Sequence, residues 1–584
     1  MDNVTLARLL DETASLLEID GADPFRVRSY RRAAEAVEQQ TTQLATVATP
    51  NADPSLLLAI PGIGKSMAAN IRDLVATGTM PLREELLTKY KPTMLELLRL
   101  PGMGPKTVAL VWSALQVSNM SELEAAAKAG LLTNLPRMGD KFAAKLLKGI
   151  EDYRRNSSRF RIDVAREFAE NISSLILAFP GIEQITPAGS LRRGRDTVGD
   201  LDLLATGPAC EPDVVAAAVE HVATLPLIDK LHARGQNKVT FTLRNNLQVD
   251  VRLLPRASYG AALQYFTGSK NHNVALRQRA IKRGLTLSEY ALLRLEDNVI
   301  VAAATEEEIY NALDLDYIPP ELRENCGEIE AAAAHTLPNL ITLADLHGDV
   351  HMHTIETDGA CTIREMAEAA ILRGRRYIAI TDHSKNLAMT NGMDDARALA
   401  HAARVRQVNQ EMEGRTHIFT GVEVDILAEG ELDLADETLA QLDIVIASVH
   451  SRFDQPADVV TARVLRAIEN PYVRILGHPT GRKLLKRDPY AVDLDKVLRR
   501  AAELGVAVEH NAAPARTDLS DAHMRLAKSL GCKISINTDA HAISELDYMQ
   551  DGIVQLRRAW LTAADVVNTA PTPDAFLAQL RPRP

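Results

Sequence analysis

Short apolar runs that end in a histidine, or are followed directly by a histidine or a carboxylate, dominate the chain after residue 346. They include YIAIT, IVIASV, VRILGH, VAVEH and KISINT, and segments with helix-like spacing separate them. This alternation predicts an α/β barrel or a layered α/β domain. Because the strand ends on one face of either fold meet at a single place, the pattern constrains the fold and the site together.

Six histidines and three carboxylates occupy these positions, in HGDVHMHTIETDG, ITDHS, TGVEVDI, ASVHS, LGHPTGR and NTDAHA. They are His351, His353, Asp358, His383, Glu423, His450, His478, Asp539 and His541. One histidine at a strand end is ordinarily a polar residue with a hydrogen-bond partner. A structural zinc needs only four ligands, so nine groups predict a cluster of two or three ions with positions open for water and substrate. His347 and His523 fit no motif, and we expect them at the surface or in the core.

A second group of carboxylates begins in GSLRRGRDTVGDLDLL, residues 189–204. Asp200 and Asp202 lie two apart in a predicted strand and so point to one face, and Asp250 in LQVDVRLL adds a third carboxylate. A solvated strand edge could carry the DLD alone. The preceding residues can cradle a phosphate through backbone, hydroxyl and guanidinium groups: Gly189, Ser190 and Arg193. Together they predict divalent cations that bridge a nucleotide's phosphates and a primer hydroxyl.

Residues 1–150 have the apolar spacing of helices and carry a repeated glycine loop. The copies are IPGIGKSMAANI at 60–71, LPGMGPKTVALV at 100–111 and a weaker LPRMGDKFAAKL at 135–146, where Arg137 replaces the first glycine. Two glycines at a helix start let backbone N–H groups approach a phosphate. Helix–turn–helix packing is the alternative role, but the repetition favours phosphate binding. These loops resemble the helix-hairpin-helix motif of DNA-backbone binding, which implies contacts from Gly62, Gly64, Lys65, Gly102, Gly104 and Lys106.

The distribution of charge divides the chain. A net charge of −11 by itself disfavours a nucleic-acid partner. However, Lys and Arg number 17 against 16 Asp and Glu in residues 1–150, 21 against 24 in 151–325, and 28 against 37 in 326–584. The excess of acidic residues is therefore concentrated in the last part of the chain.

Four cysteines without CxxC spacing exclude a cysteine zinc site and fit a reducing cytoplasm. No apolar run approaches the about 20 residues of a membrane helix, and the acidic start does not resemble a signal peptide.

The first half of the chain resembles the family X DNA polymerases, the group of DNA polymerase beta. GSLRRGRDTVGDLDLL is similar to their nucleotidyltransferase signature, and YGAALQYFTGSKNHNVALRQRAIKRGLTLSEYAL at 259–292 to their thumb segment. The resemblance covers about residues 1–325 and implies Asp200, Asp202 and Asp250 as ligands of Mg²⁺ or Mn²⁺, with Asp250 also activating the primer 3′-hydroxyl. It implies nucleotide contacts from Gly189, Ser190, Arg193, Tyr265, Phe266, Gly268, Asn273 and Arg277. Lys270 departs from the acidic residue of the vertebrate enzymes.

The second half resembles the polymerase and histidinol phosphatase (PHP) domain over about residues 345–565. The resemblance implies a distorted seven-stranded barrel with a trinuclear site, in which Glu423 bridges two ions. Imidazole and carboxylate ligands suit Mn²⁺ or Zn²⁺ better than Mg²⁺. Asn511 matches a family strand that lines the site, whereas His510 stands where an aliphatic residue is usual.

We therefore expect a multidomain fold with a helix-hairpin-helix N-terminal region, an α+β nucleotidyltransferase palm with a thumb, and a C-terminal distorted seven-stranded α/β (PHP) barrel. The expected domains are helical DNA-binding domains at 1–82 and 83–150, a palm at 151–255, a thumb at 256–316, a linker at 317–345 and the PHP domain at 346–570.

The expected function is short-gap filling in DNA repair, including base excision repair, on gapped or primer-template DNA with deoxynucleoside triphosphates. The PHP domain would remove 3′ nucleotides and cut at abasic sites. We expect a monomer at the nucleoid in the cytoplasm. A phosphomonoesterase role for the PHP domain and a DNA-binding scaffold with inactive sites are the alternatives. An RNA- or antibiotic-directed nucleotidyltransferase would share the GS…DxD core but not the glycine loops or YFTGS.

One residue of the polymerase beta pattern is missing. In that group a lysine six residues after the second glycine of the first loop forms a Schiff base that removes a 5′ deoxyribose phosphate. Counting from Gly64, that position is Asn70, and a supporting lysine two residues after the glycine is Ser66. An amide nitrogen is not a nucleophilic amine, so we expect little or no such lyase activity from residues 1–80.

Overall fold

The computed structural model describes residues 3–38, 44, 48, 54–60, 62–98, 100, 102–136, 138–156, 159–387 and 390–582. Pro61, Pro101 and Arg137 of the three glycine loops lie outside this set. The chain divides into two compact units, Met1–Ser158 with Asn245–Leu247, and Arg159–Arg244 with Gln248–Pro584. No helix within the described residues is both long enough and apolar enough to span a bilayer.

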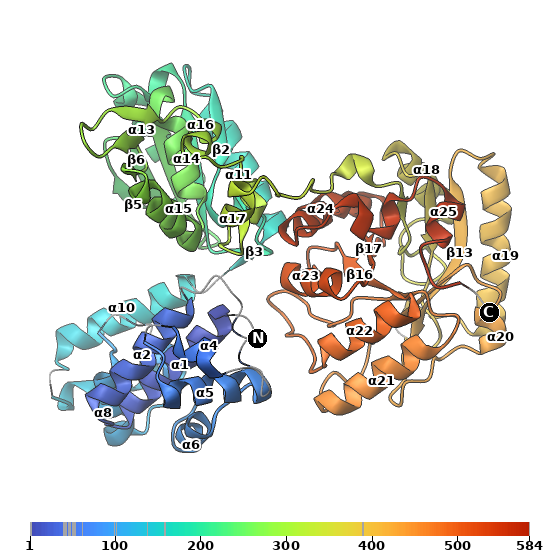
Figure 1. Ribbon diagram of the computed structural model, residues 1–584, viewed down its shortest axis with the longest axis horizontal. Helices are drawn as coiled ribbons and strands as arrows, with labels where there is room; N and C mark the ends of the chain where they lie inside the picture. The colour runs from blue at the N-terminus through green and yellow to red at the C-terminus, as the bar shows by residue number, and fades with distance from the viewer. Residues whose placement is uncertain are drawn as a thin grey trace. The chain divides into compact units, whose positions relative to one another are not determined.

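The first unit is built from helices (blue in Figure 1). They are α1 (Asn3–Ile19), α2 (Pro24–Glu38), α4 (Pro54–Leu58), α5 (Lys65–Thr77), α6 (Pro81–Lys89), α7 (Met94–Leu97), α8 (Pro105–Leu115), α9 (Met120–Lys128), the 3-10 turn η1 (Leu131–Asn134) and α10 (Asp140–Asn156). One apolar cluster joins α1, α2 and α5 through Leu10, Val37 and Ile71. A second joins α8 and α10 through Val108 and Leu146, so the first glycine loop packs on one cluster and the second and third loops share the other.

The palm contains the mixed sheet β2-β4-β7-β6-β5. Its strands are β2 (Gln184–Pro187), β4 (Asp200–Thr206), β5 (Ile228–Arg234), β6 (Lys238–Leu243) and β7 (Gln248–Leu254). The flanking elements are β1 (Phe160–Arg161), α11 (Ile162–Leu177), α12 (Gly189–Arg192), β3 (Thr197–Val198), η2 (Pro208–Cys210), α13 (Val215–Ala223) and η3 (Arg256–Ser258). β4 runs parallel to β7, which places the first two aspartates and the third on neighbouring strands.

The thumb follows with helices around a small antiparallel sheet, β10-β9-β8. Its elements are α14 (Tyr259–Thr267), α15 (Lys270–Lys282), β8 (Leu285–Leu287), β9 (Leu292–Arg294), β10 (Ile300–Ala302) and α16 (Glu306–Ala312). Residues 317–345, expected as a linker, form η4 (Pro320–Leu322), α17 (Glu328–Ala333) and η5 (Leu343–Asp345). Ile318, Leu322 and Ile329 pack into the thumb's apolar cluster. This segment is therefore part of the folded core. Its apolar side chains are buried, although Pro and Glu residues separate them in the sequence.

The described residues after Leu346 form a parallel sheet of seven strands in sequence order. They are β11 (Gly348–Asp349), β12 (Tyr377–Ile380), β13 (His417–Asp425), β14 (Ile444–Ser448), β15 (Ile475–Leu476), β16 (Ala507–Asn511) and β17 (Ile534–Asn537). A parallel bridge between Met352 and Ala540 joins the two edges, so the sheet is a nearly closed barrel.

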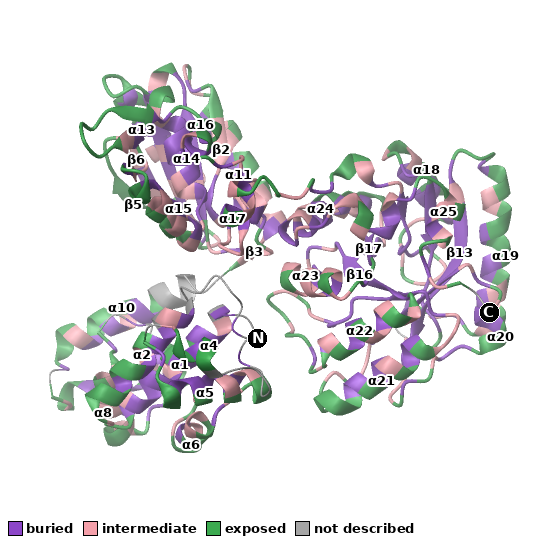
Figure 2. Cartoon of the chain, viewed as in Figure 1, coloured by how far each residue is buried: buried purple, intermediate pink, exposed green. Residues whose placement is uncertain are grey.

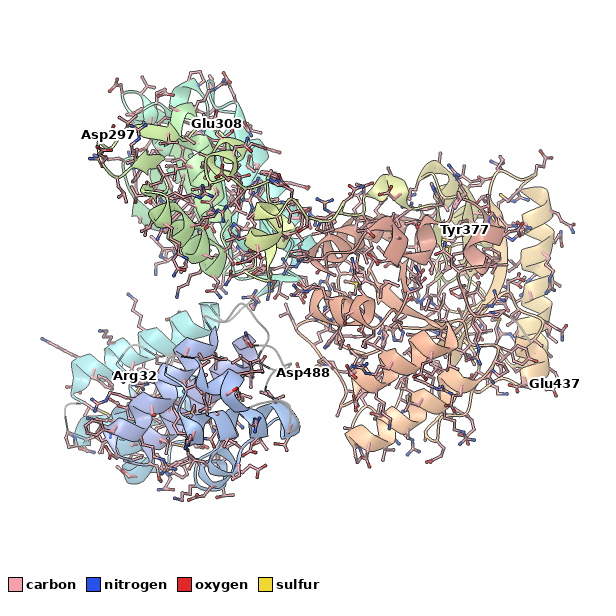
Figure 3. All side chains as sticks on the ribbon, in the orientation of Figure 1. Arg32, Asp297, Glu308, Tyr377, Glu437 and Asp488 are labelled. Atoms are coloured by element: carbon pink, nitrogen blue, oxygen red, sulfur yellow. The ribbon has the colours of Figure 1, made fainter. Side chains whose placement is uncertain are left out.

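Helices cover the outside of this barrel (Figure 1). They are α18 (Ile363–Leu372), α19 (Asp395–Glu411), α20 (Asp436–Leu439), α21 (Ala457–Glu469), α22 (Leu494–Leu504), α23 (Asp521–Ser529), α24 (Met549–Arg558) and α25 (Pro573–Leu577), with the 3-10 turns η7 (Ile543–Tyr548), η8 (Ala563–Asp565) and η9 (Val567–Thr569). The strands are buried while the helices keep an exposed face (Figure 2). Tyr377 lies among the barrel side chains, whereas Glu437 and Asp488 point to solvent (Figure 3). The fold class expected from the sequence is confirmed.

A buried charge network ties the palm to the thumb. Arg192 donates to Glu306 through both terminal nitrogens, at 2.8 and 2.7 Å, and Arg323 pairs with the same carboxylate at 2.5 Å. Burial raises the pKa of Glu306, but the two guanidinium groups outweigh burial and bring it to about 2. The ionised form therefore stabilises the folded thumb.

We expect Glu306→Gln to lower the free energy of unfolding by about 3 kcal/mol at neutral pH, from the depressed pKa. A depressed carboxyl pKa contributes its full stability above the unfolded value of 4.5 and loses it as the pH falls toward 2. The difference between the variant and the unsubstituted chain should therefore shrink below pH 4.5 in urea unfolding. Glu307→Gln, at an exposed position of the same helix, is the matched control. Equal effects of the two variants at every pH would contradict the network.

Candidate functional site

The glycine loops of the first unit share one backbone geometry. Ile63, Met103 and Met138 each donate their main-chain N–H to the carbonyl three residues earlier, at 3.1, 3.0 and 3.2 Å. Gly62 and Gly102 have φ of 96° and 89°, which other residues rarely adopt. The second glycines precede α5 and α8, and a Cβ at Gly64 or Gly104 would meet nothing within 4 Å. These helix starts are open to an anion.

The palm brings its three aspartates together on one face of the sheet, on the neighbouring interior strands β4 and β7. Asp202 lies opposite Asp250 in the register of β4 and β7, and Asp200 lies two residues before it. Burial, and then the charges of Asp200 and Asp250, raise the pKa of Asp202 to about 7. Lys238 partly offsets this crowding with Nζ at 2.9 Å from Asp250 Oδ1. Like charges held this close, with oxygen ligands only, fit a hard divalent cation.

The glycine-serine loop touches the same aspartates. Gly189 has φ of 57°, and a Cβ there would lie 2.6 Å from Asp202 Oδ2. Only glycine therefore allows this approach, which sets the expected phosphate cradle beside the carboxylates. Ser190 follows it and is half-buried. Arg193 has its Nε 3.1 Å from Glu324 Oε1 and donates to the Thr267 carbonyl.

The remaining expected nucleotide residues lie together at the start of the thumb. The rings of Tyr265 and Phe266 meet edge to face at 5.0 Å, and the Arg277 guanidinium stands 5.0 Å from the Tyr265 ring centre. Asn273 Nδ2 donates to the Tyr265 carbonyl at 2.7 Å. Gly268 has φ of 65°, and a Cβ there would lie 3.3 Å from Arg193 Nη1. Both parts of the expected nucleotide site are therefore adjacent.

The barrel gathers all nine expected ligands at the carboxyl ends of its strands. Three groups have donor atoms within 4.8 Å of one another: His353, Asp358, His383 and His541; His351, His353 and Asp539; and His383, Glu423 and His450. His478 Nε2 lies 2.9 Å from Glu423 Oε1. Glu423 thus stands at the centre, shared by several imidazoles, which is where a bridging carboxylate belongs.

The chemistry of these atoms fits bound metal ions. Within the described residues, His351 Nε2, His353 Nδ1 and Glu423 Oε2 are buried and have no hydrogen-bond partner. Burial, followed by the charges of His383 and His541, lowers the pKa of His353 to about 4, so its imidazole is neutral and able to coordinate. Burial raises the pKa of Glu423, but the surrounding imidazoles hold it well below its usual range. Burial lowers the pKa of His450 and His541, but the carboxylates beside them outweigh burial and raise it to about 9, so metal binding at these two imidazoles would release protons.

Three supporting carboxylates were not found from the sequence. Glu509 Oε1 lies 2.7 Å from His351 Nδ1, Asp425 Oδ1 lies 2.5 Å from His450 Nδ1, and the Thr354 amide donates to Asp382 at 2.8 Å. The first two contacts fix which imidazole nitrogen faces the cluster. Period-two spacing from Glu423 could have indicated Asp425, because both belong to one strand.

Two residues near the barrel's sixth strand have separate roles. Asn511 Nδ2 donates to Asp539 Oδ2 at 2.9 Å, so this asparagine lies at the cluster as expected. His510 points the other way, and its Nδ1 lies 2.8 Å from the Leu519 carbonyl. Successive residues of a strand face opposite sides, which explains why a histidine here adds no ligand.

A cationic pocket leads to the barrel cluster. Its floor includes His383, His450 and Asp539. Its walls carry basic and aromatic side chains: Arg161, Lys483, Lys486, Arg487, Arg516, Phe453 and Tyr548. Several cations beside two rings suit a chain of phosphates with bases attached.

The fold and both sites define the class as an enzyme that transfers nucleotidyl groups and also cleaves phosphoesters. Four family descriptions match: helix-hairpin-helix domain (1–80), SAM-like helix-hairpin-helix tandem (94–152), DNA polymerase beta thumb (262–324) and PHP domain (349–488). The DNA polymerase/3′-5′ exonuclease PolX of Bacillus subtilis (strain 168) is 37% identical over 582 residues, 99% of each chain. The chain therefore belongs to the family X DNA polymerases that carry a C-terminal PHP domain.

Other relatives match the barrel alone. A probable phosphatase of Thermoanaerobacter sp. (strain X514) is 34% identical over 232 residues, 38% of this chain and 89% of the relative. One of Edwardsiella ictaluri (strain 93-146) is 29% identical over 252 residues, 40% of this chain and 95% of the relative. The barrel is thus similar to proteins that lack the polymerase half.

The first glycine loop generates a prediction about lyase chemistry. Asn70 Nδ2 donates to the Tyr30 hydroxyl at 2.7 Å, whereas Lys65 lines a pocket with Ala69 and Arg72 that does not include Asn70. No amine therefore occupies the face that Asn70 presents among the described residues of α5. We expect no covalent adduct when the chain, an incised abasic duplex and borohydride are combined. A strong adduct on Lys65 would overturn this expectation, and Lys65→Ala is the variant that would identify it.

Proposed function

We propose that this chain is a DNA-directed DNA polymerase that fills short gaps during DNA repair, with a metal-dependent 3′–5′ exonuclease in its barrel. The observation that carries the polymerase half is the close approach of Gly189 to Asp202, because it joins a phosphate cradle to a carboxylate triad. The glycine loops at the starts of α5 and α8 would bind the DNA backbone without recognising its base sequence.

In the polymerase site, Asp200, Asp202 and Asp250 would hold Mg²⁺ or Mn²⁺. The ions supply charge stabilisation for the attacking and leaving oxygens of nucleotidyl transfer. Asp250 would take the proton of the primer 3′-hydroxyl. Ser190 and the main chain of its loop would orient the triphosphate.

Tyr265 and Phe266 form an aromatic pair at the start of the thumb that would lie along the nucleotide sugar. Their rings meet edge to face, and Arg252 stands 4.0 Å from the Phe266 ring centre, so the pair is held in place. A rigid wall beside the sugar would disfavour the extra hydroxyl of a ribonucleotide.

In the barrel, the six imidazoles and three carboxylates would hold two or three Mn²⁺ or Zn²⁺ ions. Such ions supply a hydroxide at neutral pH. Glu509 and Asp425 would orient imidazoles of the cluster. Arg516, with Nε 3.4 Å from Asp539 Oδ2 in the lining of the pocket, would bind the scissile phosphate. Removal of 3′ nucleotides and cleavage at abasic sites are the reactions this site would perform on DNA.

The cationic walls of the pocket favour a polynucleotide over a phosphomonoester. The probable phosphatases share the barrel without the polymerase half, so phosphomonoesterase activity is the second candidate for this site. A small phosphate ester needs one cation beside the metal ions, whereas Lys483, Lys486 and Arg487 extend the positive surface along the pocket wall. An inactive scaffold is disfavoured because the triad and all nine expected ligands are present. A monomer acting in the cytoplasm completes the proposal.

We expect Asp250→Asn to lower the rate of primer extension on gapped DNA by at least about a thousandfold while 3′ shortening persists, because the triad and the barrel cluster are separate sites. Asp539→Asn should lower the rate of 3′ shortening and leave primer extension in place. One labelled primer, incubated with Mg²⁺ or Mn²⁺ with and without nucleotides, reports both activities.

Thermal melting of both variants controls for unfolding, since the cluster also holds the barrel together. Loss of both activities in a folded Asp250→Asn chain would rule out two independent sites. Persistent shortening in a folded Asp539→Asn chain that has lost metal would place the nuclease elsewhere.

We expect the double variant Lys483→Gln/Lys486→Gln to weaken cleavage of single-stranded DNA by about tenfold and to lower its salt dependence, because phosphate contacts release counterions. Hydrolysis of a small phosphomonoester should change less than about twofold. Lys496→Gln, an exposed lysine on α22 away from the pocket lining, is the matched control. Equal loss on both substrates would favour the phosphomonoesterase.

A further inference from the structure

The loop expected to bind the triphosphate is packed against a helix of the barrel. Gln555 Nε2 donates to the Gly194 carbonyl at 2.7 Å, and Arg558 Nη1 donates to the Arg193 carbonyl at 2.6 Å. Both donors lie on α24 and are only 3% and 4% exposed. A Cβ at Gly194 would come within 2.1 Å of Val554 Cγ1, so loop and helix are in full contact. The loop at Arg193 and Gly194 therefore packs against α24, a helix of the barrel domain.

Arg558 also engages the counter-ion of Arg193. Glu324 Oε1 accepts from Arg193 Nε and from Arg558 Nη1, each at 3.1 Å. Arg558 is itself held by Asp521, with Nη2 2.8 Å from Oδ2. Burial raises the pKa of Glu324, but the neighbouring guanidinium groups bring it below its usual range, so the carboxylate is charged. Arg195 Nη1 lies 4.0 Å from the same oxygen. Three guanidinium groups therefore share one carboxylate oxygen, and the charge of Arg193 is not fully neutralised.

Further ion pairs hold α24 against the palm and thumb. Arg166 of α11 pairs with Asp551, and Arg557 Nε lies 2.7 Å from Glu321 Oε1. These pairs anchor the helix without touching the nucleotide loop. Among the residues of α24 that form described ion pairs, Arg558 alone contacts both the Arg193 carbonyl and Glu324, the counter-ion of Arg193.

We infer that Arg558, a residue of the barrel, positions the nucleotide-binding loop of the polymerase. Arg558 donates a hydrogen bond to the Arg193 carbonyl, which fixes the main chain there. It also shares Glu324 with the Arg193 guanidinium, so that this guanidinium keeps positive charge for a triphosphate. Loss of Arg558 would free the Arg193 carbonyl and leave Glu324 to Arg193 and the more distant Arg195, and both changes weaken triphosphate binding. This inference rests on the proposed function, because it concerns how the polymerase holds its nucleotide.

The test is single-nucleotide insertion on gapped DNA by the full chain carrying Arg558→Gln. We expect the KM for the deoxynucleoside triphosphate to rise about tenfold, with kcat changed less than about twofold and 3′ shortening unaltered. Arg557→Gln is the matched control, because it removes a neighbouring ion pair of the same helix that does not touch the loop. Its KM should stay at the value of the unsubstituted chain.

A second substitution separates positioning from general support. In Arg558→Gln/Glu324→Gln the charge that would neutralise Arg193 is gone, so KM should return most of the way to the unsubstituted value. If Arg558→Gln melts too early to assay, Gln555→Ala replaces it, with an expected KM increase of about threefold from one lost hydrogen bond.

An unchanged KM in the folded Arg558→Gln chain, or in Gln555→Ala where that variant replaces it, overturns the inference. A rise of equal size in Arg557→Gln overturns it as well. Failure of the proposed function gives a different result, because the unsubstituted chain would then insert no nucleotide at all.

Discussion

Crowding of ionisable groups at strand ends is the constraint on which both sites depend. Asp202 and Asp250 face each other across two parallel strands, and Glu423 is surrounded by imidazoles at the carboxyl ends of the barrel strands. Neither arrangement is stable as a set of bare charges, because burial removes the water that would screen them. Metal cations bound in the palm and in the barrel would offset this electrostatic cost. The crowding that destabilises the metal-free sites therefore also favours metal binding.

Charge also joins the halves of the second unit. Glu306 is shared by Arg192 and by Arg323, which lies in the segment packed into the thumb, and Glu324 is shared by Arg193, Arg195 and Arg558. Each carboxylate therefore pairs with guanidinium groups from different parts of the chain. A buried network of this kind tolerates the loss of one member poorly, which makes the geometry of the nucleotide loop dependent on the thumb and on the barrel.

Much of this architecture could be predicted because its signals are local. Two glycines before a helix, aspartates two apart in an apolar strand, and histidines at the ends of short apolar runs each indicate a structure within a dozen residues. The fold class, the family and the enzyme class are confirmed on that basis. The individual ligand and contact residues remain predictions, although the structure brings the nine of the barrel together and sets Gly189 against Asp202.

The sequence by itself determined which elements form and which ends of strands are polar, since side-chain periodicity and backbone preference act over neighbouring residues. Only the tertiary structure decided that Glu509 orients His351, that residues 317–345 pack into the thumb core, and that Arg558 reaches the loop of Arg193. These contacts join residues separated by 158 and 365 positions in the first and last cases. Such pairings depend on how complete elements pack against each other, and no local pattern of residues encodes that packing.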